Sequence, residues 1–110
     1  MIYKNYKRRY DKASIYLLRN IFDVERKNVY VGVNTNWSVR KYQHKRRCYA
    51  PNDRGYNYPL YRCIRNTGGW DNWVMEKIED YPCNNGKELS IRENYWIHYY
   101  NSRLNKSNIS

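Results

Sequence analysis

The sequence predicts an α+β domain in which a small antiparallel three-stranded sheet is flanked by three helices, in the order β-β-α-α-β-α. Two short apolar runs near the N-terminus are separated by a polar stretch, which is typical of an antiparallel hairpin. Further along, segments without glycine or proline follow helix-capping residues or carry apolar residues at helical spacing. A chain of 110 residues is long enough for one domain with a modest core.

The first two predicted elements form the hairpin. Residues 13–20 read ASIYLLRN and residues 29–33 read VYVGV, and both runs are rich in β-branched and aromatic side chains. The connection between the two runs is polar and contains Asp23, Glu25, Arg26, Lys27 and Asn28. The third strand is expected over residues 72–80, where NWVMEKIED alternates in character.

Three helices are expected to flank this sheet. Thr35 or Asn36 is predicted to cap a helix over residues 37–47, because both are cap-type residues that precede a run without glycine or proline. A short helix is expected over residues 60–66, ended by two glycines. The strongest helical pattern spans residues 88–103 and places four apolar side chains on one face: Leu89, Trp96, Ile97 and Tyr100.

Positive charge dominates the composition. Lys and Arg total 21 against 10 Asp and Glu, which gives a formal net charge of +11. This balance indicates a polyanionic partner, because each cation placed near a phosphate releases condensed counterions. The 14 Tyr and 4 Trp suit stacking on bases, although an AT-rich codon bias is an alternative explanation for the tyrosines. Residues 1–12 are expected to form a basic N-terminal arm, either solvated or lying along DNA, before a domain of residues 13–110.

The apolar runs and the cysteines bear on cellular location. No run approaches the roughly 20 apolar residues of a membrane span, so no membrane partner is expected. Residues 1–12 lack the apolar centre of a signal peptide. The three cysteines, Cys48, Cys63 and Cys83, form no C-x-x-C pair and no zinc-binding pattern. Free thiols indicate a reducing compartment, so an intracellular protein of the cytoplasm or nucleus is expected.

Glu93 lies on the same predicted face of the last helix as the apolar side chains. A carboxylate in such a buried stripe is costly unless it is paired or bound to a cation. An ion pair with Arg40 or Arg92 is one explanation. A metal ligand at the floor of a cleft is the other.

Local geometry brings two more pairs of side chains together. Arg40 and His44 are four residues apart and therefore neighbours on a helix, which suits them to hold a phosphate. The same helix carries four further cations: Lys41, Lys45, Arg46 and Arg47. It is alternatively an ordinary basic surface helix. Tyr16 and Tyr30 can share one face of the hairpin, since alternate strand residues point to the same side.

These residues follow the order and spacing of the motifs of the GIY-YIG nucleases, which the chain resembles over roughly residues 13–109. The first motif, Gly-Ile-Tyr, is similar to Ser14-Ile15-Tyr16, with serine in place of the glycine. The second motif is present as Tyr30-Val31-Gly32. Arg40 follows the second-motif tyrosine by ten residues, and His44 follows Arg40 by four.

The C-terminal part of the chain carries the remaining motifs. The family helix that reads Arg-Glu-x-x-Trp-Ile resembles Arg92-Glu93-Asn94-Tyr95-Trp96-Ile97. The closing motif resembles Leu104-Asn105 followed by Asn108-Ile109. Among relatives, the chain is most similar to the catalytic domains of phage and intron homing endonucleases. Those enzymes carry a separate DNA-binding region, so the alternatives are an excised or free-standing domain, with a separate targeting domain, or targeting by the basic arm or by a partner protein.

The resemblance implies a DNA endonuclease that hydrolyses a phosphodiester bond with one divalent cation and a tyrosine general base. Glu93 would hold Mg²⁺ or Mn²⁺, and Arg40 would hold a non-bridging phosphate oxygen. Tyr16, or as second choice Tyr30, would take the proton from water. A tyrosine, with an ordinary pKa near ~10, needs a nearby cation for this role.

The same resemblance assigns supporting roles. His44 would orient water or phosphate, and Asn108, or less favourably Asn105, would support the site through hydrogen bonds. Gly32 has no side chain and would let the backbone come close to the site, so it is grouped with the residues expected to bind DNA. The other residues expected to contact double-stranded DNA are Lys41, Lys45, Arg46 and Arg47.

Two alternatives keep the fold. A structure-specific or repair nuclease would use the same residues on branched or damaged DNA. A non-catalytic DNA-binding module would have a decayed site, and Ser14 is the one residue that supports this interpretation. A monomer with one site would nick DNA, whereas a double-strand cut requires a dimer or two sequential events.

Overall fold

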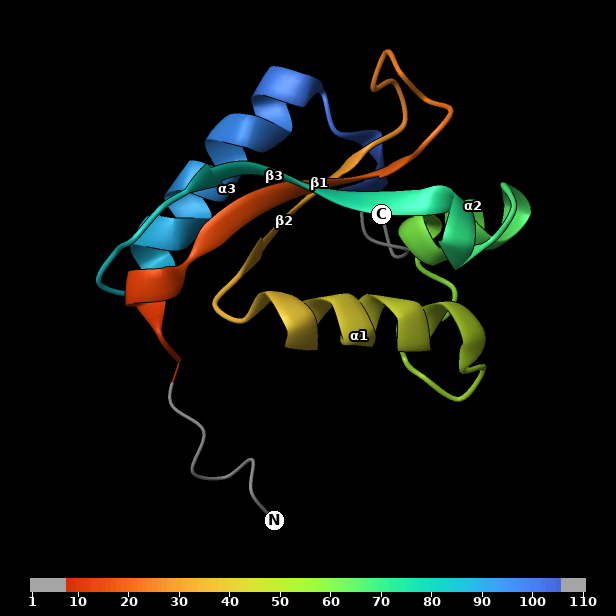
Figure 1. Cartoon of the computed structure of the whole chain (residues 1–110), viewed down its shortest axis with the longest axis horizontal. Coiled ribbons are helices and arrows are strands. Elements are labelled where there is room, and N and C mark those ends of the chain that lie inside the picture. Colours follow the sequence, from red (N-terminus) through yellow and green to blue (C-terminus); the bar gives the residue numbers. More distant parts are fainter. Residues whose placement is uncertain (1–7, 106–110) are drawn as a thin grey trace.

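A three-stranded antiparallel sheet in the spatial order β2-β1-β3 forms the centre of the protein (Figure 1). The computed structural model describes residues 8–105. The strands are β1 (Ser14–Asn20), β2 (Tyr30–Asn34) and β3 (Trp73–Asp80). The helices are α1 (Trp37–Tyr49), α2 (Pro59–Asn66) and α3 (Gly86–Tyr100). The predicted α+β class and the predicted order of elements are confirmed.

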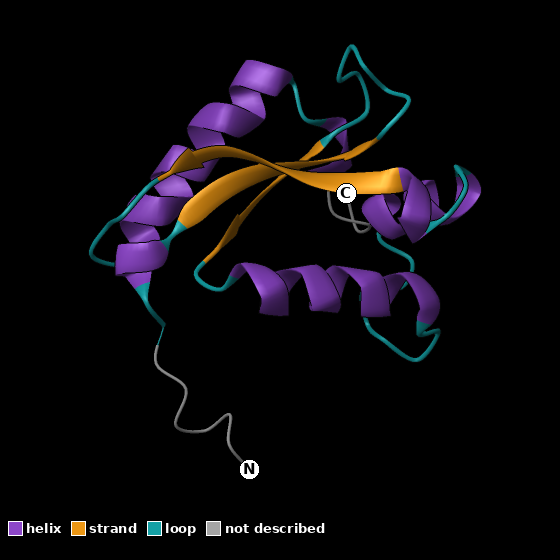
Figure 2. Cartoon of the chain, in the orientation of Figure 1, coloured by secondary structure: helices purple, strands orange, loops and turns teal. Residues whose placement is uncertain are grey.

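The helices cover both faces of the sheet (Figure 2). Tyr16 and Leu18 of the central strand pack in one cluster with side chains of α1 and α2, such as Cys48 and Ile64. The alternate residues of β1 pack in a second cluster with α3. The first five residues of β1 are therefore all buried. Burial on both faces explains why this strand reads as a continuous apolar run.

Asparagine side chains cap the two longer helices. Asn36, rather than Thr35, caps α1, and its side chain accepts a hydrogen bond from the backbone N–H of Val39 at 3.2 Å. Asn85 caps α3 in the same way. This helix ends at Tyr100, not at residue 103 as predicted, because Asn101 adopts the left-handed conformation with a φ of 50°.

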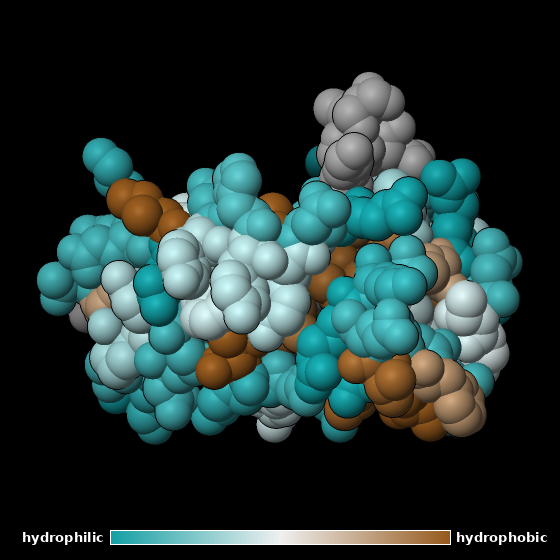
Figure 3. Space-filling view, turned by 90° about the horizontal axis from the view of Figure 1, so that it is seen from above, coloured by the Kyte–Doolittle hydropathy of each residue, from teal (hydrophilic) through white to brown (hydrophobic). Residues whose placement is uncertain are grey.

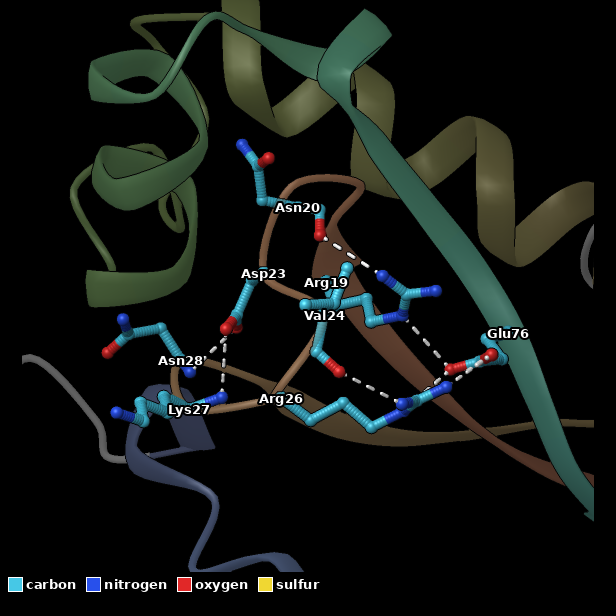
Figure 4. A network of polar contacts seen from close by, with 8 residues as sticks. All are labelled: Arg19, Asn20, Asp23, Val24, Arg26, Lys27, Asn28 and Glu76. Atoms are coloured by element: carbon cyan, nitrogen blue, oxygen red, sulfur yellow. Dashed lines mark hydrogen bonds and ion pairs between the residues drawn. The ribbon is translucent and has the colours of Figure 1, made fainter.

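A polar network attaches the loop between β1 and β2 to strand β3 (Figure 4). The Glu76 carboxylate accepts hydrogen bonds from Arg19 at 3.1 Å and from Arg26 at 2.9 Å. Within the loop, Asp23 accepts from two backbone N–H groups at 3.0 and 2.9 Å. The network therefore holds the end of the loop from which β2 begins.

Part of the segment expected to be an N-terminal arm packs against the domain. Residues Tyr10–Lys12 form a 3-10 turn, and the carbonyl of Tyr10 accepts a hydrogen bond from the backbone N–H of Cys83 at 3.0 Å. Residues 1–7 of the expected arm lie outside the described residues.

The surface is largely hydrophilic, and the cysteines are unpaired. Figure 3 shows a largely hydrophilic face on which the apolar areas are small and separate. Within residues 8–105, no helix combines the length and the apolar character that crossing a membrane requires. All three cysteines are free thiols, as predicted.

Candidate active site

Five predicted side chains, from four elements of the fold, converge near the free edge of β2. Helix α1 lies on one face of the sheet and α3 on the other, so they approach each other around this edge strand. An open groove of about 420 Å³ lies here, and Arg40 lines it together with Val33 and Leu89. The converging side chains are Tyr16 from β1, Tyr30 from β2, Arg40 and His44 from α1, and Glu93 from α3.

Tyr16 is completely enclosed by the first core cluster. Its hydroxyl lies 2.6 Å from Nε2 of His44, and its ring meets Trp37 edge-on at a centroid distance of 5.6 Å. Burial raises the pKa of Tyr16 well above its usual value and outweighs the opposing charge of Arg40. Arg40 therefore supplies the nearby positive charge that a tyrosine base requires. In the free protein its effect is smaller than that of burial, so the pKa of Tyr16 is still raised.

His44 is also completely buried, and both of its ring nitrogens have partners. Nε2 meets Tyr16, and Nδ1 lies 2.8 Å from the hydroxyl of Tyr61. Burial, followed by the positive charges of Arg40 and Arg47, lowers the pKa of His44 to about 3. The ring is therefore neutral. In the free protein its Nε2 contacts Tyr16, so any effect of His44 on water or phosphate would pass through that hydroxyl.

Arg40 connects the second tyrosine to the groove. Its Nη2 donates to the hydroxyl of Tyr30 at 3.3 Å, and its Nη1 donates to Gln43 at 3.2 Å. Burial raises the pKa of Tyr30, while the charge of Arg40 acts in the opposite direction. A guanidinium carries five N–H donors, so donors remain for a phosphate that enters the groove.

The carboxylate of Glu93 is half-buried and makes no hydrogen bond or ion pair with any residue between 8 and 105. Of its two predicted partners, Arg92 instead forms an ion pair with Glu79, and Arg40 acts on Glu93 only through its charge. Burial raises the pKa of Glu93, and Arg40 opposes this effect. The predicted ion pair is thus absent among the described residues, and the carboxylate oxygens are available to a cation.

The surroundings of Glu93 fit a hard cation with few protein ligands. The described part of the chain contains no group of three or more His, Cys, Asp or Glu side chains that could hold a metal ion. Mg²⁺ commonly binds to one or two carboxylates and keeps several of its waters, so a single carboxylate is a sufficient anchor.

Known proteins share this sequence pattern and this fold. The sequence profile described as the GIY-YIG catalytic domain matches residues 12–108. The chain belongs to this family. The catalytic domain of the homing endonuclease I-TevI has a similar structure, with a TM-score of 0.68 and 24% sequence identity over 90% of this chain and 99% of that chain. At this identity the likeness establishes the fold. No curated protein matches the chain.

In this GIY-YIG domain, the serine in place of the first-motif glycine has a partner in the sheet. Ser14 pairs with Asn34 across the hairpin, and its Oγ accepts a hydrogen bond from Asn34 Nδ2 at 2.8 Å. Both side chains are buried, and the backbone of Ser14 has no positive φ. Ordinary strand geometry therefore accommodates the one residue that supported a decayed site.

Asn105 holds the strand that carries the second GIY-YIG motif. Its Oδ1 accepts a hydrogen bond from the N–H of Val31 at 2.8 Å, and its Nδ2 donates to the Val31 carbonyl at 2.8 Å. The side chain thus pairs with the backbone of an edge strand as a neighbouring strand would. Asn108, the favoured residue for a supporting role, lies outside the described residues. Gly32 follows Val31 and faces Tyr16 across the hairpin.

The predicted DNA-binding cations of α1 fall into two pairs. Lys41 and Lys45 are exposed and have no ion-pair partner within residues 8–105. Arg46 and Arg47 each approach a carboxylate oxygen of Asp53 at 3.6 Å. The lysines are therefore the more available contacts for a phosphate backbone.

Tyr61 is the residue of the site that the sequence did not reveal. It is one of 14 tyrosines and belongs to none of the motifs. Its hydroxyl reaches His44 only because α2 packs beside α1 in the first core cluster. The contact between Tyr61 and His44 follows from no regular spacing along the chain, so local sequence patterns do not predict it.

Proposed function

We propose that this chain is an endonuclease that hydrolyses a phosphodiester bond of double-stranded DNA with one divalent cation, Mg²⁺ or Mn²⁺. The observation that carries the proposal is the half-buried Glu93 carboxylate, which has no partner among residues 8–105 and lies beside Arg40 and Tyr30 in a GIY-YIG catalytic domain. The similar I-TevI domain belongs to a homing endonuclease, which favours DNA as the substrate. The formal net charge of +11 favours the same polyanion.

Glu93 would hold the cation, and Arg40 would bind the reacting phosphate group directly. The Glu93 carboxylate is available for this role because it is desolvated and has no protein partner within residues 8–105. A cation held by Glu93 would supply neutralisation of the phosphate charge and stabilisation of the leaving 3′-oxygen. Arg40 donates to a non-bridging oxygen, on which negative charge grows during the attack of water.

Tyr16 is proposed as the general base. Turning of Arg40 onto the phosphate opens the Tyr16 hydroxyl to the groove. The Tyr16 oxygen then takes a proton from the attacking water, while its own proton moves to Nε2 of His44, 2.6 Å away. A phosphate on Arg40 offsets one of the positive charges that hold the pKa of His44 low. After the products leave, the proton returns through Tyr16 to solvent.

Cleavage of supercoiled plasmid by the purified chain tests the proposal. Wild-type protein is expected to give nicked or linear DNA only when Mg²⁺ or Mn²⁺ is present. Glu93→Gln is expected to give no product above background. Arg40→Ala is expected to lose about 100- to 1,000-fold in rate, the usual scale for one donor to a developing negative charge. Glu25→Gln changes an exposed loop glutamate and serves as the matched control, with wild-type cutting expected.

Three outcomes separate the alternatives. Equal cutting by wild type and Glu93→Gln would exclude Glu93 as the ligand. DNA binding without cutting by wild type would support a non-catalytic module instead. Tyr30, hydrogen-bonded to Arg40, is the second candidate for the base, so Tyr16→Phe and Tyr30→Phe are compared. The larger loss of kcat at unchanged KM identifies the base.

A further inference from the structure

Tyr61 is a buried polar residue that takes no part in the mechanism proposed above. It is 2% exposed, and its hydroxyl oxygen lies 2.8 Å from Nδ1 of His44. The other ring nitrogen, Nε2, lies 2.6 Å from the hydroxyl of Tyr16. The three side chains form one hydrogen-bonded chain that crosses β1, α1 and α2.

The His44 ring at the centre of this chain is neutral and carries a single N–H. Burial and the positive charges of Arg40 and Arg47 hold its pKa at about 3, far below its ordinary value. The other titratable groups near the ring are tyrosines that burial keeps uncharged by raising their pKa values: Tyr16, Tyr30 and Tyr61. The geometry therefore admits two tautomers of His44.

The two tautomers give the Tyr16 hydroxyl opposite hydrogen-bonding roles. With the proton on Nδ1, His44 donates to Tyr61 and accepts the O–H of Tyr16 at Nε2. The lone pairs of the Tyr16 oxygen then remain for the proton of water. With the proton on Nε2, His44 donates to Tyr16, whose own O–H must point elsewhere. Only the first arrangement suits Tyr16 as a base.

The hydroxyl of Tyr61 makes the first tautomer possible. It is the acceptor that lies within hydrogen-bond distance of Nδ1 in the described structure. Without this oxygen, an Nδ1–H would be buried with no acceptor, which proteins rarely tolerate. The proton would then move to Nε2, where the Tyr16 oxygen accepts it. Removal of the Tyr61 hydroxyl should thus reverse the hydrogen bond between His44 and Tyr16.

We infer that Tyr61 is a positioning residue that holds His44 in its Nδ1–H tautomer and so directs the Tyr16 hydroxyl for proton abstraction. The catalytic consequence of this inference rests on the proposed function. The tautomer itself does not, because it is a property of the free protein.

Nitrogen NMR of the His44 ring, recorded on the full chain, tests the inference directly. Wild-type protein is expected to show a protonated Nδ1 and an unprotonated Nε2. Tyr61→Phe removes one oxygen and keeps the buried ring, and it is expected to exchange the two signals. In plasmid cleavage the same variant is expected to lose about 100-fold in kcat at unchanged KM, as for loss of general-base catalysis. Tyr42→Phe, at an exposed tyrosine of α1, is the matched control with wild-type spectra and kcat.

Each outcome has one meaning. A wild-type ring protonated at Nε2, or an unchanged tautomer in Tyr61→Phe, overturns the inference. Tautomer exchange with unchanged kcat overturns the link to catalysis. No cleavage by wild type contradicts the proposed nuclease function, while the NMR comparison still decides the role of Tyr61 in positioning His44.

Discussion

The hydroxyl of Tyr16 occupies the space that a side chain on Gly32 would need. The two residues pair directly across the hairpin, and they come from the first and the second motif of the family. A Cβ atom on Gly32 would overlap the hydroxyl oxygen and would lie 2.8 Å from Cε1 of the Tyr16 ring. Tyr16 is completely buried and packs against Trp37, so its ring has no room to move aside. The absence of a side chain at position 32 is therefore a condition for the observed place of Tyr16.

Gly32→Ala is expected to destabilise the fold by about 1–3 kcal/mol, the usual cost of overpacking a filled core. Because the displaced group is Tyr16, nicking activity should fall by more than the loss of folded protein explains. Urea unfolding and plasmid cleavage measure the two effects. Gly86→Ala is the control, since its Cβ would meet the movable hydroxyl end of Tyr10 at 3.1 Å. Equal effects of the two variants would contradict the special role of position 32.

Much of the site could be predicted because its pairs are set by local periodicity. Strand alternation places Tyr16 and Tyr30 on one face, and both do pack around His44. Helical spacing makes Arg40 and His44 neighbours, and both face the tyrosines. Such relationships require no knowledge of how distant segments pack.

What the sequence did not predict depends on that packing. The burial of His44 results from α2 and from Trp70, which stacks near its ring at a centroid distance of 6.4 Å. Burial then fixes the neutral state of the ring and its partnership with Tyr61. Arg92 forms an ion pair with Glu79 and not with Glu93, and this pairing likewise depends on how α3 crosses β3. Residue spacing alone left these partners open.

Protein stability should fall with decreasing pH because of His44. Its pKa moves from an ordinary value of 6.5 to about 3 in the folded protein. Between these values the unfolded chain binds more protons than the folded one, so protonation favours unfolding. The expected loss is about 1.4 kcal/mol per pH unit below roughly pH 6.5. Urea unfolding between pH 5 and pH 6.5 measures this slope.

Two variants assign that slope to its residue. His44→Gln is expected to remove most of the dependence, whereas His98→Gln changes an exposed histidine and should leave it in place. The raised pKa of Glu93 acts in the opposite direction as pH falls, and it is common to all three proteins. The difference in slope between wild type and His44→Gln therefore isolates His44. Parallel slopes would contradict a neutral, buried ring.

Asn105→Ala should loosen the edge of β2. The variant leaves the N–H and the carbonyl of Val31 without the two hydrogen bonds that Asn105 supplies. A cost of about 1–3 kcal/mol is expected for buried backbone groups that lose their partners. Hydrogen exchange of the Val31 amide gives a local readout and should become faster. Asn94→Ala on the exposed face of α3 is the control, and unchanged Val31 exchange in Asn105→Ala would contradict the assigned role.

Lys41 and Lys45 are expected to contribute more to DNA binding than the neighbouring arginines. Both lysines are exposed without an ion-pair partner among residues 8–105, whereas Arg46 and Arg47 share Asp53. Each lysine that meets a phosphate releases counterions, so its removal should lower affinity for all DNA sequences alike. The slope of log affinity against log salt should decrease by about 0.9 for each such lysine.

Binding of Lys41→Ala and Lys45→Ala, titrated over a range of salt concentrations in Ca²⁺ or without metal, measures these slopes. Lys27→Ala is the matched control, since Lys27 lies on the β1–β2 loop, away from α1 (Figure 1), and pairs with Glu25 at 3.1 Å. An unchanged slope in the α1 variants would mean that DNA does not lie along α1, and an equal fall in Lys27→Ala would mean that the contact is not specific to this helix.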